Sequence, residues 1–365
     1  MQVRTTGTAD ASPGPTIRVG VAVSLSGPAA ELAANVLTGI RLAVKHRNDR
    51  GGVLMAGRRR PVRLIERDTA MSPEQGVAAT RTLVEEEAVP VLFGDCISTV
   101  ALAQKPVVEE ARVPWITFGS HRDLTRDRRY TFRSNDEMTR SNEMVARTAV
   151  TEFGLTRWAQ LDEDSALGRF NQESVAGFVR SLGGTVLSAG FFPSGCADFR
   201  AALNRIKEAG PQVVYSQAGG HAPAMLRQAR EIGLKVQWII GDQVTARQLV
   251  EQAGDAAVGV WQPTTFDPRS ERPSVCIFLE EARASMDRIP TATEAIGYEG
   301  PMRVFMAMEK AGSLDRDAIV RALYEVEWEG VIFMGCYRPD GEGNYGGELM
   351  AVTGQGTYVK VKTLF

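Results

Sequence analysis

The feature that most constrains this chain is a regular alternation of buried-strand and helix patterns that begins at Ile17. Apolar runs typical of buried strands occupy residues 17–25, 62–69, 89–94 and 113–119, and amphipathic helix patterns lie between them at 31–49, 72–87 and 98–112. Strands that alternate with helices in this way form a parallel sheet covered by helices on both faces. In such sheets a ligand binds beyond the carboxyl ends of the strands.

A second series of the same kind follows the first. Strands are expected at 157–164, 185–192, 212–218, 237–242 and 257–266, with helices at 168–183, 197–210 and 222–233. Helices are then expected at 274–286, 294–312 and 316–326, and residues 347–365 are typical of paired strands. Because 365 residues exceed the roughly 150 of an ordinary domain, we expect two doubly wound α/β lobes with a cleft between them.

Composition and charge exclude several classes of protein. The net charge of -2 gives no broad attraction to nucleic acid or to an anionic membrane. No apolar run approaches the roughly 18 residues of a membrane span. The four cysteines are far apart and form no C-x-x-C pair, which argues against a zinc site or a disulfide framework. The basic segment Arg58–Arg60 is expected at the exposed tip of a hairpin.

Signatures of enzymes are nearly absent from the sequence. It contains no phosphate-binding loop, no dinucleotide fingerprint after the first strand and no nucleophile elbow. The string His121–Leu124 matches the start of a kinase catalytic loop, but Arg128 stands where that motif needs an asparagine. The three histidines lack metal-ligand spacing, so neither a metal nor a cofactor is implied. Residues 162–164 could act in acid–base chemistry, although a charged loop is the commoner meaning of such a run.

Ser98 lies where the strand at 89–94 gives way to a helix, in the segment "GDCISTVALAQKP". A serine at this place is typical of a helix N-cap, whose side-chain oxygen accepts a hydrogen bond from a free backbone N–H group. The same N–H groups and the helix dipole also attract an anion. The segment alone therefore supports both a cap and a ligand site.

Several segments together resemble the type I periplasmic binding proteins of the branched-chain amino acid (Leu/Ile/Val) group of ABC transporters. "IRVGVAVSLSGPAA" and "GIRLAVKHRNDRGGV" resemble the opening of that group, and "RDTAMSPEQGVAATRTLVEEEAVPVLFG" resembles its second unit. "VVYSQAGGHAPAMLRQAREIGLKVQWIIGD" and "AIGYEGPMRVFMAMEKAGSLDRDAIVRAL" resemble its later parts, so the likeness runs from about Ile17 to the end. "GDCISTVALAQKPVVEEA" is also similar to cytosolic amide-sensing receptors of the same fold.

The resemblance implies residues for the two charged ends of an amino acid. Ser98 matches the serine that binds the α-carboxylate, and Gly119 and His121 match positions of the next loop. His121 departs from the small hydroxyl residue usual in the family, and Ser120 is expected to take over the hydroxyl role. Asp242 matches the acidic residue that pairs with the ligand ammonium, with a solvated loop acid as the alternative.

The resemblance also implies which residues line the pocket, and these depart most from the family. The positions of the family's aromatic lids carry smaller side chains here, namely Leu32, Leu167 and Ala218, and Ile296 occupies another pocket-lining position. Smaller lids leave room for a bulkier ligand, unless aromatic residues from elsewhere in the chain fill the space. The candidates for this role are Trp115, Phe118 and Trp261. For each of them a place in the pocket and a place in the hydrophobic core are equally compatible with the sequence. The family's early disulfide is missing. Cys96 lies near the position of one of its two cysteines, but Met71 stands at the position of the other.

The resemblance implies a chain that crosses three times between the two lobes. We expect a disordered leader at 1–16, an N-terminal lobe at 17–137 plus 266–336 and a C-terminal lobe at 138–265 plus 337–365. The crossings are expected near 133–138, 262–266 and 335–338 and would form a three-stranded hinge.

The leading functional hypothesis is a receptor that hands an amino acid or a related small polar molecule to an ABC permease, with no catalysis. It would be periplasmic or lipid-anchored outside the cell, as a mature form whose signal has already been removed. The alternative is a cytosolic sensor of amides or amino acids that acts on a regulatory partner, which a native start at Met1 would favour. Neither hypothesis involves nucleic acid.

Overall fold

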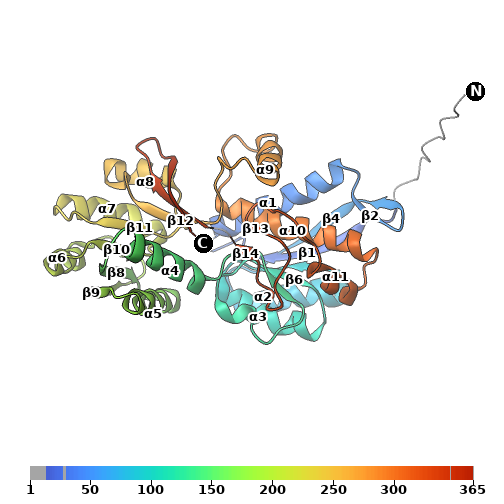
Figure 1. Cartoon of the computed structure of the whole chain (residues 1–365). Helices are drawn as coiled ribbons and strands as arrows, with labels where there is room; N and C mark the ends of the chain where they lie inside the picture. Colours follow the sequence, from blue (N-terminus) through green and yellow to red (C-terminus); the bar gives the residue numbers. More distant parts are fainter. Residues whose placement is uncertain (1–13, 28–29, 346, 365) are drawn as a thin grey trace, which may run out of the picture.

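The computed structural model describes residues 14–27, 30–345 and 347–364, so most of the expected leader lies outside the described residues. Two lobes lie side by side, each built on its own sheet (Figure 1). This arrangement confirms the α/β fold class with two doubly wound lobes. No helix in the described ranges is both long enough and apolar enough to cross a bilayer.

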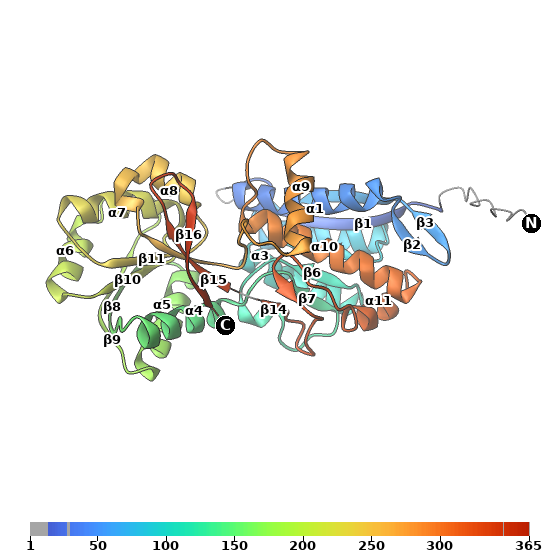
Figure 2. The same ribbon diagram turned by 45° about the horizontal axis from the view of Figure 1, so that its top comes forward.

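The first lobe contains a five-stranded sheet in the order β4-β1-β5-β6-β7, and its strands pair in parallel. Its strands are β1 (Ile17–Val23), β4 (Val62–Asp68), β5 (Leu92–Phe93), β6 (Trp115–Thr117) and β7 (Thr131–Arg133). Its helices are α1 (Ala30–Asp49), α2 (Pro73–Arg81), α3 (Ser98–Glu110), α9 (Pro273–Arg283), α10 (Ala292–Ala311) and α11 (Arg316–Leu323). The hairpin β2 (Val53–Met55) and β3 (Arg58–Arg60) carries the exposed arginines at the end of this lobe far from the second lobe (Figure 2).

Alternating side chains of the first sheet enter separate cores on its two faces. Val21 and Ile116 belong to the core under α1 and α10, whereas Ala22 and Trp115 belong to the core under α2 and α3. This alternation follows from the period of two residues along a strand. Helices α1 and α10 meet at glycines: a Cβ atom on Gly39 would lie 2.1 Å from the carbonyl oxygen of Glu294.

The second lobe contains a seven-stranded sheet in the order β16-β15-β12-β11-β10-β8-β9. Its strands are β8 (Arg157–Glu163), β9 (Thr185–Phe192), β10 (Val213–Ser216), β11 (Gln237–Ile240), β12 (Trp261–Thr264), β15 (Gly347–Val352) and β16 (Tyr358–Leu364). The central strands are parallel. The antiparallel pair β15–β16, drawn in red in Figure 2, adds to β12. Its helices are α4 (Met138–Arg147), α5 (Ala166–Ser181), α6 (Arg200–Ala209), α7 (Ala222–Glu231) and α8 (Ala246–Ala253).

The chain passes between the lobes where strands of one sheet lead to elements of the other. Strand β7 ends at Arg133 and leads to α4, and β12 ends at Thr264 shortly before Phe266, which belongs to the first lobe's core. The third crossing differs from the expectation near 335–338. Strands β13 (Phe333–Met334) and β14 (Asn344–Tyr345) pair on the first lobe, and the chain joins the second sheet only at Gly347.

Candidate functional site

The loops at the carboxyl ends of strands from both sheets face each other between the lobes. The His121 ring, in the loop after β6, lies 6.0 Å from the Phe170 ring on α5 of the second lobe. The Arg122 guanidinium lies over the same Phe170 ring. These contacts bring the loop after β6 against α5, the helix that follows β8. Ligands of parallel α/β sheets bind at such strand ends, which makes this region the candidate site.

Ser98 is the first residue of α3, and the N-cap is Ile97, without a side-chain cap. The expected capping role of Ser98 is therefore wrong for this structure. Its half-buried hydroxyl makes no hydrogen bond to any residue in the described ranges. A Cβ atom on Gly119 would lie 3.3 Å from the Ser98 Oγ atom, so these two expected site residues are neighbours. A free hydroxyl beside the first turn of a helix can bind an anion.

A buried carboxylate fixes the loop that carries Ser98. Asp95 accepts hydrogen bonds from the hydroxyls of Ser24 and Thr69 and from the Ile97 N–H group. Gln104 on α3 accepts from the Asp95 N–H group at 3.0 Å and donates to the Ala22 carbonyl at 3.1 Å. Burial raises the pKa of Asp95 despite these hydrogen bonds. This network joins β1, β5 and α3, and so it positions Ser98.

The buried side chain of Arg133 fixes the backbone of the loop Gly119–His121 through hydrogen bonds. One terminal nitrogen of Arg133 donates to the Gly119 carbonyl and the other donates to the His121 carbonyl at 2.9 Å. The Arg133 Nε atom lies 2.9 Å and 3.0 Å from the two carboxylate oxygens of Glu342. The Ser120 hydroxyl has no hydrogen-bond partner within the described chain, and Nδ1 of His121 accepts from the Asp123 N–H group. The Ser120 hydroxyl therefore offers a polar group for a ligand, whereas Nδ1 of the His121 ring is already engaged.

Asp242 lies in the exposed loop that follows β11 at the carboxyl end of the second sheet. Solvent reaches its side chain, but protein atoms crowd around the carboxyl, and this loss of hydration is the main reason that its pKa rises to about 7. The carboxylate of Asp136, in the first crossing, adds to the rise. No lysine or arginine in the described part of the chain forms an ion pair with Asp242. The site therefore has an excess of negative charge at this end.

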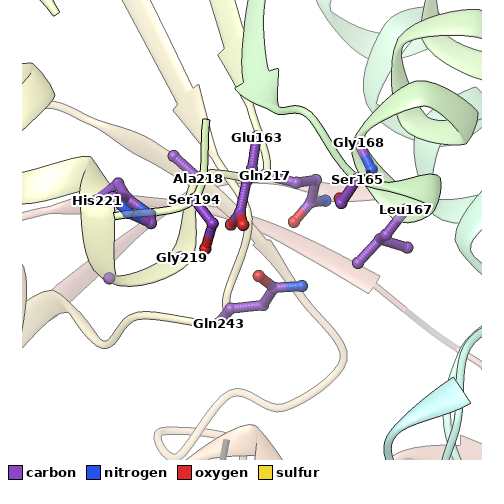
Figure 3. Close-up of a pocket in the computed structure, with 11 residues that line it drawn as sticks. Glu163, Ser165, Leu167, Gly168, Ser194, Gln217, Ala218, Gly219, His221 and Gln243 are labelled. Atoms are coloured by element: carbon purple, nitrogen blue, oxygen red, sulfur yellow. Dashed lines mark hydrogen bonds between the residues drawn. The ribbon is translucent and has the colours of Figure 1, made fainter. Parts of the chain in front are cut away.

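A cavity of about 410 Å³ opens at the carboxyl ends of the second lobe's strands (Figure 3). Leu167 and Ala218 line it, whereas the other expected site residues, including Ser98 and Asp242, do not. The full lining is Glu163, Ser165, Leu167, Gly168, Ser194, Gln217, Ala218, Gly219, Gly220, His221 and Gln243. The structure thus separates the expected residues into a first-lobe group around Ser98 and a second-lobe cavity next to Asp242.

The remaining expected positions lie partly or wholly in packed regions. Ile296 is only 8% exposed in the first lobe's core, and Leu32 is half-buried on α1. Trp115 and Phe118 are buried core residues, and the Trp261 ring packs 4.9 Å from that of Phe153. None of these five side chains lines the cavity.

Further polar cavity residues lie at strand ends, and of these the sequence analysis named only Glu163, as part of the acidic run 162–164. Glu163 ends β8, Ser194 follows β9, Gln217 follows β10 and Gln243 follows β11. Within the acidic run 162–164, Asp162 is buried, and its Oδ1 atom accepts from the Gln217 N–H group at 2.7 Å. Position just after a strand of a parallel sheet is the sequence signal that could have selected them.

The comparisons with known proteins agree with this geometry. The family model described as periplasmic binding protein matches residues 16–357. This chain belongs to the periplasmic binding protein family. It is 25% identical over 315 residues to a Leu/Ile/Val-binding protein homolog 1 of Brucella abortus, across 85% of this chain and 82% of that protein. The resemblance inferred from the sequence is thereby confirmed.

Solved structures extend the likeness to the fold. An ABC transporter substrate-binding protein from Sphaerobacter thermophilus is 28% identical, with a TM-score of 0.86 over 96% of this chain and 98% of that one. A leucine binding protein from Thermotoga maritima shares the fold with a TM-score of 0.83 and 23% identity, over 96% of this chain and 99% of that one. The family model and these relatives are all described as binding proteins.

Proposed function

We propose that this protein is a solute-binding receptor that captures an amino acid or a related small polar molecule and delivers it to an ABC permease. The observation that carries the proposal is the free hydroxyl of Ser98 on one lobe and the unpaired carboxyl of Asp242 on the other. Each charged end of a zwitterion needs its own partner, because an unpaired charge removed from water is costly. The names of the Leu/Ile/Val-binding relatives support the same class of ligand.

In the proposed mechanism, the ligand carboxylate accepts hydrogen bonds from the Ser98 hydroxyl and from free N–H groups in the first turn of α3. The positive end of the helix dipole adds to this attraction. The Ser120 hydroxyl lies in the adjoining loop and provides a further donor. Asp242, deprotonated, pairs with the ligand ammonium. Contacts to both lobes favour the closed arrangement, which the permease would recognise in a periplasmic or extracellular setting.

Calorimetric titration of matched variants tests the proposed binding mode. A thermal-shift screen first selects a ligand, which at 100 times its Kd stabilises the fold by about 2.7 kcal/mol. Ser98→Ala should then weaken binding by about 1.5–3 kcal/mol, the range for a hydrogen bond to a charged group. Thr99→Ala removes an exposed hydroxyl from the same turn of α3 and should leave affinity unchanged. Equal affinity in wild type and Ser98→Ala, with both folded, would refute this role of Ser98.

Delivery to a permease is tested separately in proteoliposomes that contain the candidate ABC permease. Liganded protein should stimulate ATP hydrolysis and uptake, whereas Ser98→Ala at the same ligand concentration should stimulate less. Binding without any stimulation would instead favour a ligand sensor.

A further inference from the structure

We propose that the second-lobe cavity is the subsite for the ligand's side chain, and that Glu163 makes it selective for a positively charged end, either an ammonium or a guanidinium group. The inference rests on the proposed function, since it assumes that the α-carboxylate and α-ammonium groups bind at Ser98 and Asp242. It goes further by naming a substrate class, the basic amino acids.

The position of the cavity suits a side-chain subsite. Gln243 on its wall directly follows Asp242, and Gln217 and Ala218 follow the neighbouring strand β10. A ligand whose ammonium group lies at Asp242 therefore extends into the cavity without leaving the strand ends. A volume of about 410 Å³ is within the range of pockets that hold small molecules.

The wall of the cavity is polar. Figure 3 shows the side chains of Glu163, Ser194, Gln217 and Gln243 around the same space. Leu167 is the one large aliphatic side chain in the lining. A branched aliphatic side chain would remove these groups from water without giving them partners, at a cost for each group. A side chain that donates several hydrogen bonds would satisfy them.

Glu163 differs from the acidic residues on either side of it. Asp162 accepts hydrogen bonds from the Gln217 N–H group and from Asn171, and Asp164 forms an ion pair with Arg169 at 2.5 Å. Glu163 is half-buried on the cavity wall, and its carboxylate has no hydrogen-bond or ion-pair partner among the described residues, although its backbone carbonyl accepts from the Ser165 N–H group. The lining contains no lysine or arginine. A cationic ligand group would supply the missing partner.

Other carboxyl groups strengthen the negative potential at this end of the lobe. The second carboxylate oxygen of Asp162 is buried without a hydrogen-bond partner, and the Asp162 side chain packs behind Gly168, which lines the cavity. The pKa of Tyr215, in the strand between β8 and β11, is raised by burial and also by Asp162, Asp242 and Asp136. These groups attract a cation from solution and disfavour an anionic side chain.

Titration with paired amino acids tests the charge preference of the subsite. L-Arginine and its neutral near-isostere L-citrulline are compared by calorimetry, with L-lysine and L-leucine alongside. Arginine should bind at least about tenfold more tightly than citrulline and leucine, as expected for a charge-assisted hydrogen bond. Glu163→Gln should weaken arginine and lysine by about tenfold to a hundredfold while citrulline changes by less than about threefold. Asp164→Asn, which removes the neighbouring exposed charge, is the matched control and should leave all four affinities unchanged.

The outcomes separate this inference from the proposed function. Tighter binding of leucine than of arginine, or an equal loss for arginine and citrulline in Glu163→Gln, would overturn the cationic subsite and leave the amino-acid receptor standing. Failure of every amino acid to bind would count against the proposed function. In that case agmatine, which has the guanidinium group but no carboxylate, tests the cavity by itself. Glu163-dependent binding of agmatine would support the subsite, and no binding would refute it.

Discussion

At the scale of single residues, the site depends on polar groups that the fold leaves without partners. Ser98 begins a helix whose cap position belongs to Ile97, and Glu163 lies between two carboxylates that have partners of their own. Both side chains are half-buried, one in the first-lobe group around Ser98 and the other on the wall of the second-lobe cavity. A ligand that contacts both lobes would supply hydrogen bonds to these groups.

Asp242 makes ligand binding depend on pH. Its pKa of about 7 means that the carboxyl is protonated below neutrality, and a ligand ammonium group requires the ionised form. Affinity for an amino acid should therefore fall about tenfold for each pH unit below 7 and level off above it. Calorimetry between pH 5 and 8.5 measures this slope, and buffers of different ionisation enthalpy count the released proton.

Two variants identify the source of this pH dependence. Asp242→Asn should abolish the slope and weaken binding at pH 8, because the ammonium group loses its charged partner. Asp136→Asn should keep the slope but move its midpoint to lower pH, because the Asp136 carboxylate helps to raise the pKa of Asp242. A slope that survives in Asp242→Asn would assign the titration to another group.

The raised pKa of Asp242 also affects stability without ligand. The folded protein holds a proton on this group up to about pH 7, whereas the unfolded chain releases it near pH 4. Between these values the folded state binds more protons, so the contribution of Asp242 to the free energy of unfolding decreases as pH rises. A bound ammonium group favours the ionised carboxylate and so offsets this loss of stability. Ligand should therefore raise the free energy of unfolding most at pH 7 and above.

At the scale of elements, local patterns predicted the fold well and the site only in part. The strand and helix runs carry their own hydrophobic periodicity, so both series of alternating elements were expected from the sequence. Ser194 and Gln243 each follow a strand, but no hydrophobic periodicity marks them as neighbours, since only the strand order β11-β10-β8-β9 brings their loops together. The late third crossing was missed for the same reason, because a long-range contact of Glu342 with Arg133 keeps that segment on the first lobe.

The buried pair Arg133–Glu342 links two elements and the ligand loop. Arg133 is fully buried at the end of β7, and Glu342 reaches it from the segment between β13 and β14. Removing one partner of such a pair leaves an uncompensated buried charge and costs about 3–5 kcal/mol. Glu342→Gln should therefore lower the free energy of unfolding by an amount of this order, measured by chemical denaturation.

The double variant Arg133→Met/Glu342→Leu separates stability from positioning. Replacing both charges with apolar groups should restore much of the stability lost in Glu342→Gln. Ligand affinity in the double variant should be lower than in the wild type, because the carbonyl groups of Gly119 and His121 lose the donors that hold them. Wild-type affinity in a stable double variant would show that the loop does not need Arg133.

At the scale of the whole molecule, the lobes have separate sheets and separate cores, and in the described part of the chain the connections follow β7, β12 and β14. Two of these connections are tied together: the Tyr345 hydroxyl donates to the Arg133 carbonyl and accepts from the Asn135 N–H group at 3.2 Å. Separate cores that are joined by short crossings favour rotation of rigid lobes about a hinge over deformation within either lobe.

Ligand should therefore close the lobes, because a zwitterion bound by Ser98 on one lobe and Asp242 on the other favours only an arrangement in which both contacts form. A ligand shifts a conformational equilibrium only through its different affinity for the two states.

Small-angle scattering should show a smaller radius of gyration with saturating ligand than without it. Asp242→Asn, at a concentration that still saturates the first-lobe contacts, should bind with less compaction. An unchanged radius of gyration in the wild type would mean that ligand binds to a preformed cleft, and the permease would then have to recognise the ligand itself rather than lobe closure.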